Sequence, residues 1–247
     1  MEGLHEHNLG LAIRKSSRPR NPTAAELALG RFDALVDDFY KKYRVKPLVG
    51  ETKQQKAKRL QFEAQDLRFL KRLRIELIAH ARVEDLQAKL QTYSAENLKK
   101  TAKDLLLEKH HPTAKLANNL TAAGEPKPTK NHEPHHIILG SGRFRKAEMR
   151  AARLNLHMHK IGINAPNNGV WLTNYAKNKA FNWEAPDYPV HRSIHTFNYE
   201  TWISAKFLKG IPNKQRFEAN LFQVKMDLKH GTYPKELLEG KNELWKG

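Results

Sequence analysis

The placement of histidines constrains this chain more than any other feature of its sequence. Seven of the thirteen histidines fall between positions 132 and 195, and cysteine is absent. Any transition-metal site must therefore use imidazole, carboxylate or backbone oxygen, and thiolate zinc sites and disulfides are excluded. The pair His135–His136 opens a short apolar run, Ile137–Leu139, and His191 and His195 have the i, i+4 spacing of one helix face. Two imidazoles at that spacing can reach one ion, whereas the alternative is a pair of solvated surface histidines.

A histidine doublet is weak evidence by itself. His110–His111 is also a doublet, and we expect it at a helix end, where positive charge is favourable and no chemistry is implied. His135 and His136 differ because they open an apolar strand. Neighbouring strand residues point to opposite sides, so we expect one of the two to bind metal and the other to face substrate.

The net charge of +18 is the strongest bulk signal. Lysine and arginine that neutralise phosphates release condensed counterions, so nucleic acid is the natural partner, although ribosome or anionic membrane binding gives the same signal.

No apolar run approaches the ~20 residues that span a bilayer, and the first ten residues lack the apolar centre of a signal peptide. We therefore expect a protein made in the cytoplasm, with no membrane span.

The periodicity of apolar residues and the positions of proline and glycine predict four segments. Residues 1–22 form a basic mobile lead-in, 23–111 a helical N-terminal domain, 112–131 a linker marked by the Pro–Gly cluster, and 132–247 the domain that carries the histidines.

We expect three helices in the N-terminal domain. The first begins at Thr23, which forms a capping box with Glu26, the second occupies much of 52–92, and the third begins at Ser94. In the second half we expect strands at 137–139 and 169–173 and helices at 146–160, 191–207 and after Gly210. The fold class is α+β and predominantly α.

The segment from His135 to about Tyr199 resembles the His-Me finger (ββα-metal, HNH) nucleases, particularly their AHH branch. In that branch a small residue and two histidines open a strand that continues with an Ile-Ile pair. The three parts of the pattern occur here in the right order, as His135–His136, Asn168–Thr173, and His191 with His195. Pro134 replaces the alanine of the family, and the stretch 174–189 is an insertion relative to compact members.

The resemblance implies a ββα-metal module in which His135, His191 and His195 ligate one divalent ion. It implies that His136 is the general base that activates water and that Asn168 holds its ring. The residues leave the identity of the ion open, because imidazoles suit Zn²⁺ or Ni²⁺ and Mg²⁺ prefers oxygen ligands. An imidazole with a pKa near ~6.5 can accept a proton at neutral pH when a second group fixes its tautomer.

The expected function is a metal-dependent DNA endonuclease with little sequence specificity. The resemblance further implies a bacterial toxin or secreted effector that an immunity protein neutralises, and an acidic partner would complement this charge. Residues 1–110 could engage a secretion machine, DNA or another partner. The alternatives are a non-catalytic basic nucleic-acid-binding protein and an RNase of the same fold. The candidate phosphate contacts are Arg143, Arg145, Lys146, Arg150 and Arg192.

Overall fold

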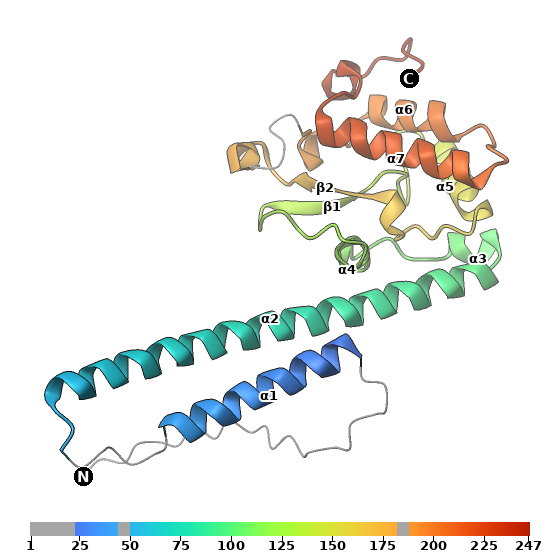
Figure 1. Cartoon of the computed structure of the whole chain (residues 1–247). Coiled ribbons are helices and arrows are strands. Elements are labelled where there is room, and N and C mark those ends of the chain that lie inside the picture. The colour runs from blue at the N-terminus through green and yellow to red at the C-terminus, as the bar shows by residue number, and fades with distance from the viewer. Residues whose placement is uncertain (1–22, 44–49, 182–187) are drawn as a thin grey trace. The chain divides into compact units, whose positions relative to one another are not determined.

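The computed structural model describes residues 23–43, 50–181 and 188–247. These residues are predominantly helical with one small antiparallel hairpin, which confirms the expected fold class (Figure 1). The chain divides into two compact units, Met1–Arg82 and Val83–Gly247. The expected basic lead-in, 1–22, lies outside the described residues, as does the middle of the expected insertion, 182–187.

The first unit contains α1 (Ala24–Tyr43) and the first part of the long helix α2 (Lys53–Lys99). Thr23 and Glu26 form the expected capping box: Thr23 N–H donates to Glu26 Oε2 at 2.7 Å, and Glu26 N–H donates to Thr23 Oγ1 at 3.2 Å. None of the helices among the described residues is long and apolar enough to cross a membrane.

The second unit begins inside α2 and contains the hairpin and the remaining helices. In chain order its further elements are α3 (Ala102–Leu106), α4 (Ala114–Ala122), β1 (His132–His136), α5 (Lys146–Met158), β2 (Gly169–Thr173), α6 (Phe197–Phe207) and α7 (Lys214–His230). Short 3-10 helices lie at Pro166–Asn168, Ala176–Phe181, His191–Ser193 and Lys235–Leu238.

Helix α3 begins elsewhere than the sequence indicates. Ser94 lies within α2, and the side chain of Thr101 caps α3 through a capping box with Asp104. The prediction of a helix start at Ser94 was therefore wrong, because the apolar spacing continues through Ser94 and a serine can remain inside a helix when the packing face persists.

The expected linker over 112–131 contains α4. Leu116 and Leu120 of this helix are fully buried and pack against Trp171 of β2. The unit boundary instead falls between Arg82 and Val83, within α2. Proline and glycine in this stretch mark the turns around α4 and not a flexible connection, because the apolar face of a nine-residue helix covers the hairpin.

The histidine doublet lies at the C-terminal end of β1, where the chain leaves the hairpin. Strands β1 and β2 are antiparallel, with His132 opposite Thr173 and His136 opposite Gly169. A Cβ on Gly169 would approach Leu116 Cδ1 to 2.6 Å, so α4 can pack this closely only against glycine. Strand β2 is confirmed at the predicted residues, whereas the strand predicted at 137–139 is wrong because pairing ends at His136.

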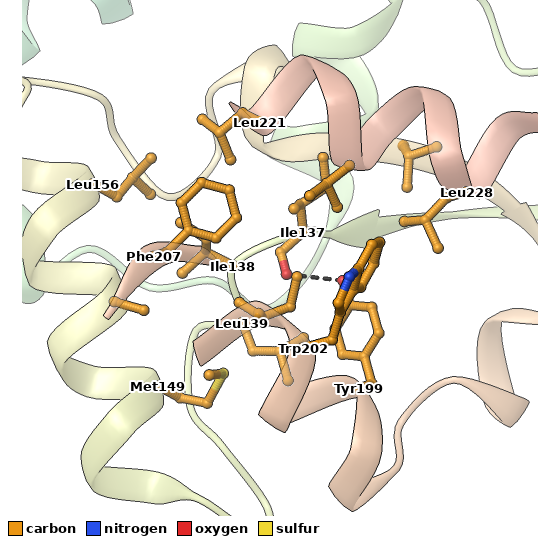
Figure 2. Close-up of a cluster of buried hydrophobic side chains, with 14 of the residues drawn as sticks. Ile137, Ile138, Leu139, Met149, Leu156, Tyr199, Trp202, Phe207, Leu221 and Leu228 are labelled. Atoms are coloured by element: carbon orange, nitrogen blue, oxygen red, sulfur yellow. Dashed lines mark hydrogen bonds between the residues drawn. The ribbon is translucent and has the colours of Figure 1, made fainter. Parts of the chain in front are cut away.

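The apolar run Ile137–Leu139 enters the core directly after β1. Figure 2 shows these side chains among residues of α5, α6 and α7, including Met149, Tyr199 and Leu221. All of them are buried. Burial of a side chain of this size contributes about 1.5–3 kcal/mol, so the core fixes the end of β1 and with it the backbone of both histidines.

Candidate active site

Three histidines converge at one end of the hairpin. One nitrogen each of His135, His191 and His195 lies within 4.8 Å of the other two. The Nε2 atoms of His191 and His195 are 3.1 Å apart, and each of these two rings lies 5.1 Å from the His135 ring between centroids. Two nitrogens that each bind one ion at about 2 Å lie about 3 Å apart, so this spacing fits a shared ion.

The partners of His135 fix which of its nitrogens is free. Tyr199 donates its hydroxyl proton to the carbonyl of Ile137 at 2.8 Å (Figure 2). Its oxygen therefore accepts from Nε2 of His135, 2.9 Å away. In the neutral ring Nδ1 then carries the lone pair, and this buried atom has no hydrogen-bond partner among the described residues. An orphaned lone pair beside two other imidazoles is the pattern expected of a metal ligand.

His191 is oriented in the same way by a carboxylate. Its Nδ1 donates to Glu133 Oε2 at 2.8 Å, which leaves the Nε2 lone pair toward His195. Glu133 comes from β1, two residues before His135, and also lies 3.8 Å from Arg192. A carboxylate behind a ligating imidazole fixes the tautomer and raises the basicity of the ligand nitrogen.

Electrostatics keep these rings neutral at pH 7. Burial, together with the positive charge that His191 and His195 would carry, lowers the pKa of His135 well below its usual value. Burial, with the neighbouring His191 and Arg192, lowers the pKa of His195 to about 4. Burial also lowers the pKa of His191, although the hydrogen bond to Glu133 opposes it. Neutral imidazoles are the form that binds metal, so the three residues fit a divalent ion.

The second histidine pair reaches the site without the expected helix. His191 begins a 3-10 turn, His191–Ser193, and His195 lies in the loop before α6. Thr196 caps α6 by accepting from the N–H of Tyr199 at 3.0 Å. The prediction of one helix over 191–207 was wrong at its start, because this cap ends the preceding turn and starts a new helix.

His136 points away from the three-histidine cluster, as alternation along a strand requires. Its Nε2 lies 3.1 Å from Oδ1 of Asn164, and the side chain is 5 % exposed. The amide nitrogen of Asn164 donates to Glu108 Oε1 and to the carbonyl of Lys109, so its oxygen must face the imidazole. His136 is therefore protonated on Nε2, and Nδ1 holds the lone pair.

Burial lowers the pKa of His136 to about 4, against the hydrogen bond to Asn164 that raises it. The ring is consequently neutral at pH 7 and able to accept a proton. The two histidines of the doublet thus face different partners, as expected of neighbouring strand residues.

Asn168 does not hold the ring of His136, so this part of the expectation was wrong. Its Oδ1 accepts from the N–H of Ile138 at 2.8 Å, and its Nδ2 donates to the carbonyls of Ile138 and Ile163 at 3.1 and 2.9 Å. The side-chain amide of Asn168 therefore pairs with the backbone of Ile138 as a strand residue would. Its bond to Ile163 also holds the loop that carries Asn164. Asn168 thus supports the site through the backbone, and Asn164 makes the direct contact.

The doublet His110–His111 also lies beside the site, contrary to the expectation that it has no chemical connection. The rings of His110 and His136 are 6.1 Å apart in an edge-to-face arrangement. A Cβ on Gly140 would clash with the His110 ring, so glycine is required where the loop after Leu139 passes this residue. Sequence spacing could not reveal this proximity, because His110 precedes the first residue of β1, His132, by more than twenty positions.

The five basic candidates divide by position. Arg143 and Arg192 are exposed and contribute to the lowered pKa of His195, which places them near the metal-ligand candidates. Arg145 is held by Glu148 and Thr201 at 3.0 Å each. Lys146 and Arg150 lie exposed on α5. Arg143 and Arg192 are therefore the better placed of the five to meet a phosphate.

The comparison with protein families agrees with this geometry. Residues 116–226 match the AHH family, described as a nuclease family of the HNH/ENDO VII superfamily with conserved AHH. The match contains the hairpin and all four site histidines, and Pro134 stands before the doublet. Neither the curated proteins nor the solved structures include a match to the chain.

Proposed function

We propose that this chain, of which residues 116–226 match the AHH nuclease family, is a divalent-metal-dependent endonuclease that cleaves DNA with little sequence preference. The match to the AHH nuclease family supports a nuclease activity. One observation supports the metal dependence most strongly: the partnerless, buried Nδ1 of His135 faces two more neutral imidazoles. Burying a lone pair without a partner costs about 1–3 kcal/mol, and a bound cation would remove that cost.

His136 is the candidate general base. Asn164 holds its protonated Nε2, so Nδ1 can accept a proton from the attacking water, while the resulting positive charge is stabilised through the same hydrogen bond. Because Nε2 of His136 pairs with a neutral amide and not with a carboxylate, the protonated ring can release its proton after the reaction.

His135, His191 and His195 would hold the ion. When bound, a divalent ion supplies positive charge that stabilises the scissile phosphate and the leaving oxygen. Arg143 and Arg192 are exposed beside these residues and would bind the flanking phosphates. Contacts of this kind favour the backbone over base edges, which supports weak sequence preference.

The direct test is nicking of supercoiled plasmid in the presence of Mg²⁺, Mn²⁺, Zn²⁺ or Ni²⁺. We expect cleavage that EDTA abolishes and that His136→Ala reduces by about 100- to 10,000-fold. His230→Ala, which removes an exposed histidine at the end of α7, is the matched control and should cleave as the wild type does. Intact plasmid with every metal would refute the enzymatic proposal and favour a basic binding protein.

The nucleic-acid preference requires its own comparison. Matched DNA and RNA duplexes, incubated with the enzyme and the most effective metal, should show faster cleavage of DNA. Faster cleavage of RNA would replace the proposed DNase with an RNase of the same fold.

The proposed biological role is an antibacterial toxin delivered by a dedicated secretion system and neutralised by an acidic immunity protein. The net charge of +18 supports an acidic partner. Expression of the wild type in bacteria should stop growth and degrade the chromosome, whereas His136→Ala should not. Equal growth with both proteins would contradict the toxin role.

A further inference from the structure

Hydrogen bonds hold both the backbone and the side chain of Asn164. It is fully buried, and its backbone carbonyl accepts from Nδ2 of Asn119 at 2.8 Å. Its side-chain amide donates to Glu108 Oε1 at 2.9 Å and to the Lys109 carbonyl at 3.0 Å, and its oxygen faces His136. Every polar contact needed to fix the direction of this amide is therefore present.

The direction of the amide determines the tautomer of His136. Carboxylate and carbonyl oxygens only accept hydrogen bonds, so they bind the NH₂ end of Asn164. A rotated amide would present NH₂ to His136 and would favour a lone pair on Nε2. Glu108 supplies one of the two acceptors that prevent this rotation, and its charge makes it the stronger one.

Glu108 is itself held by two further residues. Tyr93 of α2 donates its hydroxyl proton to Oε2 at 2.9 Å, and Lys115 donates to Oε1 at 3.0 Å. Burial raises the pKa of Glu108, but the hydrogen bonds from Asn164 and Lys115 outweigh it and leave the pKa below its usual value. The side chain is therefore a carboxylate at neutral pH.

Tyr93 is packed tightly on the same loop. A Cβ on Gly162 would clash with the Tyr93 hydroxyl, so the loop reaches this residue only because position 162 is glycine. Tyr93, Glu108 and Lys115 all precede residue 116, where the family match begins. The contacts that orient His136 thus extend into a part of the chain that lies outside the family match.

We propose that Glu108 is a positioning residue for His136, that it acts through the amide of Asn164, and that Tyr93 holds it in place. The segment Val83–Lys115 is then a functional part of the nuclease and not only a packing helix. The catalytic consequence rests on the proposed function, because it requires His136 to be the base. The structural consequence, a fixed Nε2–H tautomer, does not.

The first experiment reads the tautomer by NMR. In protein labelled with ¹⁵N-histidine, long-range ¹H–¹⁵N correlations distinguish Nε2–H from Nδ1–H. His136 should be the Nε2–H form in the wild type, and Glu108→Ala should shift it toward a mixture. Glu108→Gln keeps an acceptor oxygen for Asn164 and should retain the wild-type signal.

Glu96→Ala is the matched control, because it removes an equal charge from an exposed site on α2. Unfolding curves of all variants identify those that remain folded. If Glu108→Ala does not fold, Tyr93→Phe, which removes only the hydroxyl that donates to Glu108, should shift the tautomer in the same direction, and an unchanged signal would overturn the proposal. An unchanged Nε2–H signal in folded Glu108→Ala would overturn the proposal.

The second experiment measures plasmid cleavage by the same variants. We expect kcat of Glu108→Ala to fall by about tenfold or more relative to Glu96→Ala, with KM within about twofold and with Glu108→Gln close to the wild type. If the wild type cleaves and Glu108→Ala matches Glu96→Ala, the positioning role is refuted. If the wild type cleaves nothing while the tautomer shifts, the proposed function fails and the positioning of His136 stands.

Discussion

The hydroxyl of Tyr199 accepts a hydrogen bond from Nε2 of His135 at 2.9 Å and donates one to the carbonyl of Ile137 at 2.8 Å. This one contact joins the core to the metal-ligand candidates, because Tyr199 and Ile137 are both fully buried. The direction of the two hydrogen bonds leaves Nδ1 of His135 as the only nitrogen of that ring available to an ion.

Tyr199→Phe should therefore weaken metal binding. The substitution leaves Nε2 of His135 without a partner and frees the tautomer, for which we expect a loss of about 10- to 100-fold in affinity for Zn²⁺. Isothermal titration with the metal measures it, and Tyr40→Phe on α1 is the control. Equal affinities in Tyr199→Phe and the wild type would show that this hydroxyl does not prepare the site.

Glu133 makes the corresponding contact behind His191. Glu133→Ala should lower metal affinity by about tenfold or more, because the tautomer of His191 is no longer fixed. Glu133→Gln retains an oxygen that can accept from Nδ1 and should lose less. The order wild type, Gln, Ala in a competitive zinc titration is the expected result, and an Ala variant that binds as well as the Gln variant would contradict it.

Asn168→Ala tests the structural role of that residue. The substitution removes the partners of three buried backbone groups on Ile138 and Ile163, so we expect the free energy of unfolding to fall by about 3 kcal/mol or more. Urea denaturation measures the change, with the exposed neighbour Asn167→Ala as the control. A variant of wild-type stability with no nuclease activity would instead support a direct role of Asn168 beside the base.

Stability should fall in mild acid. Burial lowers the pKa of His157 and of His136 to about 4, whereas the unfolded chain binds a proton near pH ~6.5. The unfolded state then holds more protons between these values, so the free energy of unfolding decreases as pH falls from ~6.5 toward ~4. The loss is a few kcal/mol in total.

Urea unfolding of EDTA-treated protein at pH 7.5 and pH 5 measures this dependence. His157→Gln, which removes a titrating ring from α5, should show a smaller difference between the two pH values. Equal or greater stability at pH 5 would contradict the account.

The sequence predicted which histidines lie together better than it predicted the elements that carry them. The resemblance to the AHH nucleases grouped His135, His191 and His195, and the structure brings these three together. The predicted helix through His191 was wrong because Thr196 starts a new helix. Ligand identity depends on side-chain chemistry, whereas local geometry depends on caps that compete over one or two residues.

The orienting residue could not be predicted in the same way. Asn164 and Asn168 are four positions apart, and only the path of the intervening loop decides which amide meets His136. That path is set by tertiary contacts with Glu108 and Asn119, far away in the sequence. His157 is likewise buried by tertiary contacts, with Arg153 and the Ile161 carbonyl as its partners.

The most direct test of the account is the position of a metal ion in crystals of the protein grown with Zn²⁺, located by anomalous scattering at the zinc edge. We expect one peak bonded to Nδ1 of His135 and to Nε2 of both His191 and His195, at about 2 Å from each, with His136 uncoordinated and its Nε2 still on Asn164. A peak coordinated by His136, or none among these three histidines, would contradict the central claim.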